Sequence, residues 1–504
     1  MRCVPEIKMT RPSPCSCVVF ALALCAVAVS RAHAAVAEAD KATIDQMLQA
    51  SLDQYHVASV TAEVRQNGEV IYSNSLGYAD LEWGVRPTPE ALYAIGSITK
   101  SITSFVVLNL VHQGKLRLNS RLGDVLPKYK GPAEEVTILQ LLTHTSGIPD
   151  YAGDGGPPLW GDPRREFTEQ QVVDLFKDKP LNFKPGSHWQ YSNSGYYMLS
   201  RVIEQVTGKS YGEAVQEVLL GPFGLSHIVL GRRTAVIGKR VMGYTINAHG
   251  QVENALTSPM VVALGAGAYL ASADDLTRYV ADLFSAAVPA AVHQMMFRRV
   301  SLLDGTEVNY LPAALEESNF YGHEQFSHGG GYFGFHAYVA YYPDQKVAIA
   351  VLTNTDSVES QAGNLPIGRI AGKIAHVILN IPQPSVEDVP LSRSEAKAYV
   401  GNYRMREFMS SDRVRFFYEK NSLWMKVGTD ARAIWYALPQ NNVKKQEKET
   451  TGAVQLLYQG HGRFVEKGDH ESQVEFISGG SDHLDVRLGA WHTGKFAGHA
   501  SPAT

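Results

Sequence analysis

The sequence predicts an α/β protein of the α+β type, in which a mixed domain precedes a small all-β domain. Apolar residues recur at helical spacing over residues 44–55. Two alternating runs follow, 59–65 and 69–75, and the Asn67-Gly68 pair between them is typical of a tight hairpin turn. Beyond residue 382 only short alternating runs remain, so the second part of the chain is expected to consist of strands.

Proline-rich sequence separates the two parts. Pro382, Pro384 and Pro390 mark a linker over residues 382–391, which leaves 35–381 as the mixed domain and 392–504 as the all-β domain. Glycine and asparagine turns divide the second domain, and the spacing favours a barrel or a sandwich. Its expected strands are 413–419, 423–427, 433–438, 454–458, 473–477 and 483–488, and Phe416, Trp424 and Trp435 are expected in its core.

The first 34 residues have the pattern of a secretory signal peptide. Basic residues precede an apolar run, 16–30, that is too short to span a bilayer, and Ala32-His33-Ala34 predicts cleavage after Ala34. A lipoprotein site at Cys25 is the alternative, although the bulky Leu24 before it fits less well. We therefore expect a periplasmic or secreted protein with no membrane span after cleavage.

Composition limits the partners of the mature chain. All four cysteines (Cys3, Cys15, Cys17 and Cys25) lie within the signal segment, so disulfides, thiol nucleophiles and cysteine metal sites are not expected. Cleavage would remove four basic side chains and one acidic one, changing the formal charge from −4 to −7. Basic residues are not clustered into one face, and nucleic acid is therefore not an expected partner.

Within the mixed domain, several elements can be placed from local signals. An apolar helix is expected to open at Ser97 and to end near Gly114, and another is expected over 197–206. Ser272-x-x-Asp275 resembles a capping box. Residues 335–342 and 347–352 form a second hairpin pattern around Pro343-Asp344, whereas the Gly- and Pro-rich segment 150–167, with Trp160, predicts a surface loop that could shape the substrate site.

Three short motifs in a fixed order point to chemistry: Ser97-Ile98-Thr99-Lys100, Tyr191-Ser192-Asn193 and His328-Gly329-Gly330. A serine hydroxyl must lose its proton as it attacks, and Lys100 lies one helical turn from Ser97, where burial would lower its pKa and let it accept that proton. Tyr191 could take or relay the proton, and Asn193 could bind the substrate carbonyl. These groups are the components of an acyl-transfer site that needs no cofactor.

Other motifs in the chain match known functional patterns in their residues but not in the secondary structure or spacing that those patterns require. Gly208-Lys209-Ser210-Tyr211-Gly212 has the G-x-S-x-G spelling, but a helix precedes it, so Gly208 is read as a helix stop and Ser210 as the next N-cap, with Glu213 completing a capping box. The glycines from Gly329 to Gly334 fit G-x-G-x-x-G, but a strand follows, which excludes a dinucleotide site. His323, His328 and His336 lack zinc spacing, and no metal is expected.

The three motifs resemble those of the serine β-lactamase and penicillin-binding protein superfamily, most of all its branch of class C β-lactamases, D-alanyl-D-alanine carboxypeptidases and esterases. Residues 94–100, Leu141 to Gly147, Lys184-Pro185-Gly186 and 273–276 agree with it. The resemblance covers about residues 40–380. It implies a five-stranded antiparallel sheet flanked by helices with a helical insert, and the tail resembles the lipocalin-like domain of some members.

By this resemblance Ser97 is the acylated nucleophile, Lys100 its partner and Tyr191 the general base. Asn193, His328 and Gly330 would contact the substrate, and the backbone N–H groups of Ser97 and Gly331 would form the oxyanion hole. The substrate would be a small molecule or peptide with an ester or amide bond: a D-amino-acid peptide, a small ester or a β-lactam.

One departure bears on the substrate. The third motif of β-lactamases usually begins with lysine, whereas this chain has His328, whose imidazole is ordinarily uncharged at pH 7. This weighs against efficient β-lactam hydrolysis and favours esterase or peptidase work with an alkaline-leaning pH profile. Two alternatives stay open: a penicillin-binding or sensor protein that is acylated at Ser97 without turnover, and a binding protein whose β domain carries a lipid-like ligand.

Overall fold

The computed structural model describes most of the chain from residue 37 onward. The predicted signal peptide, Trp160 and Trp435 lie outside the described residues, as does most of the predicted 150–167 loop. The described ranges are 37–152, 167–247, 249–256, 260–357, 367–382, 386–387, 389–404, 413–427, 453–467, 469–478, 484–489 and 500–501.

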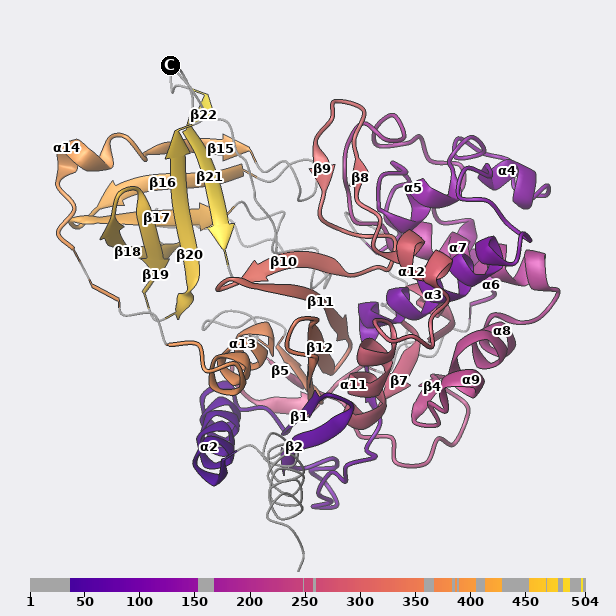
Figure 1. Ribbon diagram of the computed structural model, residues 1–504, viewed down its shortest axis with the longest axis horizontal. Coiled ribbons are helices and arrows are strands. Elements are labelled where there is room, and N and C mark those ends of the chain that lie inside the picture. Colours follow the sequence, from indigo (N-terminus) through magenta and orange to yellow (C-terminus); the bar gives the residue numbers. More distant parts are fainter. Residues whose placement is uncertain are drawn as a thin grey trace, which may run out of the picture.

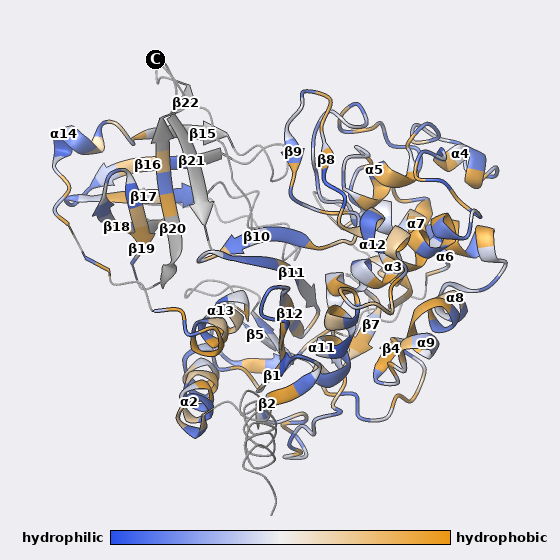
Figure 2. Cartoon of the chain, viewed as in Figure 1, coloured by the Kyte–Doolittle hydropathy of each residue, from blue (hydrophilic) through white to orange (hydrophobic). Residues whose placement is uncertain are grey.

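An antiparallel sheet organises the mixed part of the chain, with strand order β10-β11-β12-β13-β1-β2. The mixed α/β architecture is as predicted, but this sheet has six strands where the resemblance implied five. The additional strand, β10, is predominantly hydrophilic and lies at the sheet edge (Figure 2). The strands are β1 (Ser59–Gln66), β2 (Glu69–Gly77), β10 (Glu316–Phe320), β11 (His323–Tyr332), β12 (Phe335–Tyr342) and β13 (Val347–Thr353).

Helices cover both faces of this sheet. Helices α2 (Glu38–Tyr55) and α13 (Ile367–Ile378) pack together on one face, and α11 (Ala273–Asp282) packs on the other (Figure 1). The alternation of β1 explains the arrangement, because Val60, Ala62 and Val64 join the core formed with α2 and α13. The intervening residues Thr61, Glu63 and Arg65 are polar and also buried, and the last two lie against α11.

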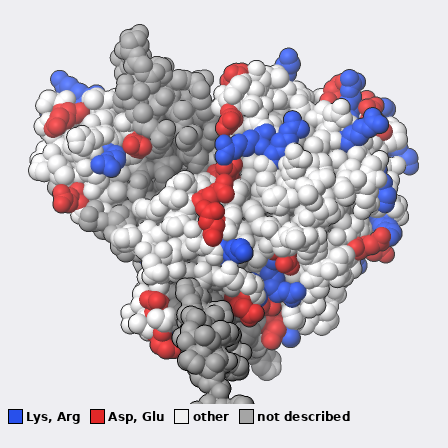
Figure 3. All heavy atoms as spheres, in the orientation of Figure 1, with Lys and Arg blue, Asp and Glu red and all other residues white. Residues whose placement is uncertain are grey.

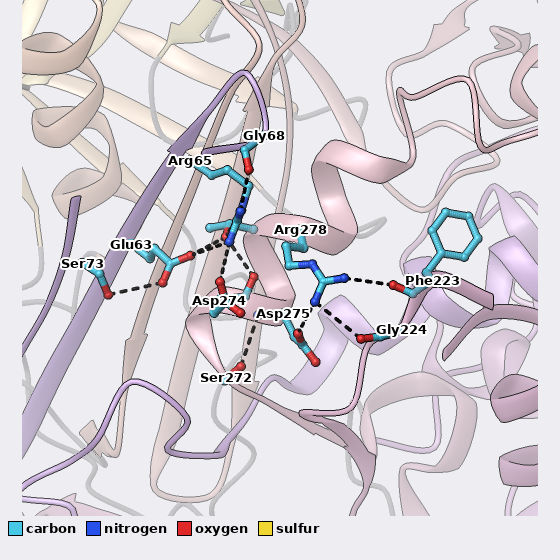
Figure 4. Close-up of polar contacts among 11 residues, drawn as sticks. Glu63, Arg65, Gly68, Ser73, Phe223, Gly224, Ser272, Asp274, Asp275 and Arg278 are labelled. Atoms are coloured by element: carbon cyan, nitrogen blue, oxygen red, sulfur yellow. Dashed lines mark hydrogen bonds and ion pairs between the residues drawn. The ribbon is translucent and has the colours of Figure 1, made fainter. Parts of the chain in front are cut away.

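A buried ion-pair network fastens α11 to the sheet (Figure 4). Arg65 donates through Nη2 to Asp274 and through Nη1 to the Gly68 carbonyl, 2.8 Å away. Glu63 accepts from the Thr277 hydroxyl at 2.7 Å, and burial raises the pKa of this carboxyl. The helix begins where predicted, with the Ser272 hydroxyl accepting from the backbone N–H of Asp275, but the box is not reciprocal because the Asp275 carboxylate accepts from the backbone N–H of His227.

The remainder of the mixed part is largely helical and stands beside the sheet (Figure 1). Its central element, α3, is buried on nearly every side, so it forms the core of this region rather than a surface layer. The helices are α3 (Thr99–His112), α4 (Leu122–Val125), α5 (Ile138–Leu142), α6 (Glu169–Val173), α7 (Asn193–Thr207), α8 (Tyr211–Val215), α9 (Gly221–Phe223), α10 (Leu264–Gly267) and α12 (Ala290–Met296), with short η1 (Gly96–Ile98), η2 (Gln216–Leu220) and η3 (Met260–Val262).

Local signals fixed several of these boundaries. Gly208 ends α7 with φ +69°, and Ser210 caps α8 in a reciprocal box with Glu213, so the G-x-S-x-G spelling is a helix-to-helix junction, as predicted. Smaller sheets complete the mixed part: β4 (Ile228–Leu230) with β3 (Tyr93–Ala94) and β7 (Tyr269–Ala271), β5 (Tyr244–Ile246) with β6 (Val252–Asn254) and β14 (Thr355–Ser357), and β8 (Val300–Ser301) with β9 (Glu307–Val308).

The C-terminal part forms a separate antiparallel sheet with strand order β21-β20-β19-β18-β17-β16-β15-β22. Phe416 is 1% exposed in its core, as predicted, whereas Trp424 is only partly buried and donates to the Glu419 carbonyl. The elements are α14 (Arg393–Ala396), β15 (Gly401–Arg404), β16 (Arg413–Glu419), β17 (Ser422–Val427), β18 (Val454–Gly460), β19 (Arg463–Glu466), β20 (Asp469–Ser478), β21 (Leu484–Gly489) and β22 (Ala500–Ser501).

On the face of the molecule shown in Figure 3, an acidic band lies beside a run of basic side chains, and the other charges are scattered toward the rim. Near β10, for example, Arg299 forms ion pairs with Glu317 and Glu307. Within the described ranges, the helices are all too short or too polar to cross a bilayer.

Candidate active site

Ser97 lies in the short turn η1, directly before α3. The turn needs glycine at position 96, because the backbone there has φ +49° and a Cβ would come within 2.4 Å of the Gly331 carbonyl oxygen. The side chain of Thr99 anchors the start of α3 by accepting from the backbone N–H of Tyr269 at 3.1 Å. These contacts hold the partly exposed Ser97 at the helix N-terminus, against strand β11.

Lys100 is fully buried beneath Ser97. Its Nζ lies 3.1 Å from Ser97 Oγ, 2.8 Å from Asn193 Oδ1 and 2.7 Å from the Ala266 carbonyl oxygen. Burial lowers the pKa of this amine to about 7, and the Asp150 carboxylate opposes the shift. A large share of the molecules therefore carries a neutral amine in contact with the serine hydroxyl near neutral pH, which is what proton removal from Ser97 requires.

Tyr191 completes the same group. The Lys100 Nζ lies 4.6 Å from the centre of the Tyr191 ring. The phenol oxygen is shielded from solvent and has no hydrogen-bond partner of good geometry among the described residues, although Ser97 is near enough to affect it. Burial raises the pKa of Tyr191 well above its ordinary value, and the Asp150 charge adds to that effect while Ser97 opposes it. The phenol is therefore protonated at neutral pH.

The segment from His144 to Tyr151 cradles the second motif. The ring Nδ1 of His144 accepts from the backbone N–H of Ser192 at 3.0 Å, and the Ile148 carbonyl accepts from the Ser192 hydroxyl at 3.0 Å. Since Nδ1 is an acceptor, Nε2 carries the proton of the neutral ring. Burial lowers the pKa of His144 well below its usual value, so this residue is an uncharged support for the motif.

Asp150 extends this support to Asn193. Its Oδ1 accepts from the Asn193 backbone N–H at 3.1 Å, and its Oδ2 accepts from Asn193 Nδ2 at 3.0 Å. The other end of the amide, Oδ1, faces Lys100. Asp150, Asn193 and Lys100 thus form a continuous polar chain that ends at the Ser97 hydroxyl.

His328 lies on β11 but is 3% exposed, and its ring is engaged on both sides. Nδ1 contacts the carbonyl oxygen of Gly329, and Nε2 lies 3.1 Å from the Tyr310 hydroxyl. Tyr310 in turn packs against His144, with ring centres 4.6 Å apart. Here the third motif contributes a buried ring that holds Tyr310, and its nitrogens do not project as a basic group toward a substrate.

The glycines of the third motif serve close packing against the nucleophile. A Cβ at Gly330 would lie 1.9 Å from the Ile95 carbonyl oxygen and 3.2 Å from the Ser97 nitrogen. Strand β10 pairs with β11 only as far as Ser327, and within the described ranges no strand pairs with the following residues on that edge. The backbone of Gly331 meets the turn at Gly96. The free edge and the N-terminus of α3 therefore meet at Ser97, where backbone N–H groups can receive developing negative charge.

Sequence reasoning placed Ser97, Lys100, Tyr191 and Asn193 correctly as neighbours but missed Asp150, His144 and Tyr310. Asp150 was assigned to the start of a surface loop because it precedes glycines and prolines. The signal that could have found it was the run from Leu141 to Gly147, which the resemblance had already singled out and which ends just before it.

A serine hydroxyl, a buried amine and a phenol between a sheet edge and a helical region define an acyl-transfer protein with a serine nucleophile. The chain belongs to the Beta-lactamase family, whose profile matches residues 44–371. Its relatives include penicillin-binding protein 4* of Bacillus subtilis (strain 168), which is 26% identical over 393 residues, covering 72% of this chain and 83% of that protein.

Solved structures agree with this assignment. An octameric penicillin-binding protein homologue from Pyrococcus abyssi superposes with a TM-score of 0.59 at 21% identity, over 91% of this chain and 99% of that chain. A D-stereospecific amidohydrolase from Streptomyces sp. superposes with a TM-score of 0.54 at 25% identity, over 62% of this chain and 94% of that chain. The first of these shows a similar fold across both parts of the molecule. Together the comparisons support a β-lactamase-like serine hydrolase or acylating protein.

Proposed function

We propose that this protein hydrolyses an amide or ester through an acyl-enzyme at Ser97. Ser97 Oγ attacks the substrate carbonyl carbon while its proton passes to the neutral amine of Lys100. The backbone N–H groups of Ser97 and Gly331 receive the negative charge that develops on the carbonyl oxygen. As the C–N or C–O bond breaks, Tyr191, a neutral phenol, relays a proton to the leaving group, and water then reverses these steps to release the acid.

The contact between Lys100 and Ser97 carries this proposal. Burial of an amine costs free energy, so an amine that is 0% exposed and 3.1 Å from a hydroxyl is a candidate catalytic group, and its pKa of about 7 suits a proton acceptor. Tyr191 is less suited to the role of free-enzyme base that the resemblance gave it, because burial and Asp150 both disfavour its ionised form. In this proposal Lys100 is therefore the base and Tyr191 the relay.

The third motif guides the choice of substrate. A substrate carboxylate beside the scissile bond would need a cation, and the His328 ring nitrogens are already directed at Gly329 and Tyr310. The similarity to a D-stereospecific amidohydrolase points the same way. We therefore favour amides or esters of amino acids without a free carboxylate at that position, D-amino-acid amides above all, over β-lactams.

Intact-mass analysis after a fluorophosphonate, with peptide mapping, tests the acyl-enzyme. A single adduct on Ser97 is expected, and the Ser97→Ala variant should remain unlabelled. Turnover is then compared for D- and L-phenylalanine amide, an activated ester and a penicillin. Sustained release from the D-amide supports the proposal, whereas a burst from the ester with no steady state would instead select a penicillin-binding or sensor protein. Labelling at another residue would refute the proposal.

A further inference from the structure

Asp150 is a carboxylate within the polar chain that ends at the nucleophile, yet it has no chemical step in the reaction proposed above. It lies two residues before the described chain is interrupted, and its Oδ1 also accepts from the Ala152 backbone N–H at 3.2 Å. Among the described residues, its hydrogen bonds are to Ala152 and Asn193, and none is to Ser97. Any effect of Asp150 on acyl transfer must therefore pass through Asn193 or through its charge.

The carboxylate decides which way the Asn193 amide points. With Nδ2 directed at Asp150, Oδ1 faces the Lys100 amine at 2.8 Å. Rotation of the amide by half a turn would set its oxygen against the carboxylate, which is repulsive, and its NH₂ group against the amine, which is repulsive whenever the amine is protonated. The backbone N–H of Asn193 is held by the same carboxylate at 3.1 Å, which fixes the start of α7 as well.

The charge of Asp150 also reaches the reacting groups. Lys100 on α3, the Tyr191 phenol before α7 and the adjacent Tyr151 phenol all respond to this carboxylate. It raises the pKa of Lys100 against the stronger effect of burial. Burial also raises the pKa of the Asp150 carboxyl itself, whereas the Ala152 backbone N–H, Lys100 and Asn193 favour its ionised form. The neighbouring His144 is held neutral by burial and by Lys100, so it does not compensate for Asp150.

We infer that Asp150 is a positioning residue for acyl transfer: it holds the Asn193 amide oxygen against Lys100 and supplies the negative charge that balances the buried amine. The inference rests on the proposed function, because it assigns Lys100 the task of taking the Ser97 proton. Removal of the Asp150 charge would make the protonated amine less favourable and would therefore lower the pKa of Lys100.

The rate of fluorophosphonate labelling at Ser97, measured from about pH 5 to pH 9.5, tests this inference on the full chain. In Asp150→Asn the midpoint of the rising limb should move to lower pH than in the wild type, and the plateau rate should fall about 10- to 100-fold because the amide of Asn193 loses its orientation. Asp150→Glu keeps the charge, so its midpoint should stay near the wild-type value while its plateau falls. Asp178→Asn removes the same charge from an exposed site outside this polar chain and should change neither.

Each outcome decides the matter. An Asp150→Asn variant with an unshifted or alkaline-shifted midpoint, or with a wild-type plateau, would overturn the inference. If Asp150→Asn does not fold, as judged by circular dichroism, Asp150→Glu decides instead, and a wild-type plateau in that variant would overturn it. The two proposals fail separately: a wild type unlabelled at Ser97 refutes the acyl-enzyme, whereas a labelled Asp150→Asn with an unshifted profile refutes only the role of Asp150.

Discussion

Gly330 offers the sharpest test of how the sheet edge shapes the site. In Gly330→Ala the new methyl carbon would come 1.9 Å from the Ile95 carbonyl oxygen, about 1.5 Å closer than an ordinary contact allows. Both partners are backbone, so neither can rotate away. Relief requires β11 to withdraw from the Ser97 turn by an ångström or more, and a displacement of about 1 Å can cost on the order of 100-fold in rate.

The assay is the second-order rate of Ser97 labelling by a fluorophosphonate, together with thermal unfolding. We expect Gly330→Ala to label about 100-fold more slowly and to lose about 1–3 kcal/mol of stability from overpacking. Gly329→Ala is the matched control, because its methyl group would meet only the Tyr338 ring at 3.8 Å. Wild-type labelling by Gly330→Ala would show that the strand edge and the nucleophile are not packed as described.

Three further predictions follow from the buried groups. The labelling rate of the wild type should rise with pH through a midpoint near 7 and then level off, because deprotonated Lys100 is the reactive form; a rise that continues above pH 9 would indicate a tyrosinate base instead. Tyr191→Phe should still be labelled by fluorophosphonate at Ser97, because the fluoride leaving group needs no proton. The same variant should lose about 100-fold or more in amide turnover, where the leaving amine must be protonated, and equal losses in both assays would contradict the role of Tyr191 as a proton relay. Arg65→Met should lower the free energy of unfolding by about 3–5 kcal/mol near pH 8, because it leaves the Glu63 carboxylate buried without its cation. Burial raises the pKa of Glu63, so this loss should become smaller as the pH falls and the carboxyl takes up a proton. The exposed Arg299→Met should cost under about 1 kcal/mol in chemical denaturation, and similar losses in the two variants would contradict the role of burial.

The features that could be predicted from the sequence are mostly those set by local residue patterns. The pairing of Ser97 with Lys100 follows from helical spacing alone, and the hairpin of β1 and β2 follows from alternation around Asn67-Gly68. The approach of Asn193 to Lys100, from 93 positions away, was available only through the resemblance to a family. Spacing determines neighbours within one element, whereas contacts between distant elements depend on how those elements pack.

The features missed from the sequence share one cause. Strand β10 reads Glu316-Glu317-Ser318-Asn319-Phe320, which lacks an apolar alternation, and it becomes a strand because β11 supplies its hydrogen-bond partners. The His328 ring was expected in the substrate pocket, but Tyr310 from a separate segment binds it and buries it. Likewise, Asp150 reads as a loop residue until Asn193 meets it. In each case a contact with a segment distant in the sequence, rather than the local sequence, determines the conformation or the environment of the residue.

The position of β1 has a consequence for biosynthesis. This strand is among the first elements of the chain, yet it lies between β2 and β13, and its register pairs Val60 with Thr353. Almost 300 residues must therefore be made before the sheet can close, which gives the fold a high contact order and a slow final step. Until β13 has been synthesised, β1 lacks its pairing strand on that side and part of its core packing. During synthesis its apolar side chains must therefore be covered by other contacts, such as those with a chaperone, to avoid aggregation.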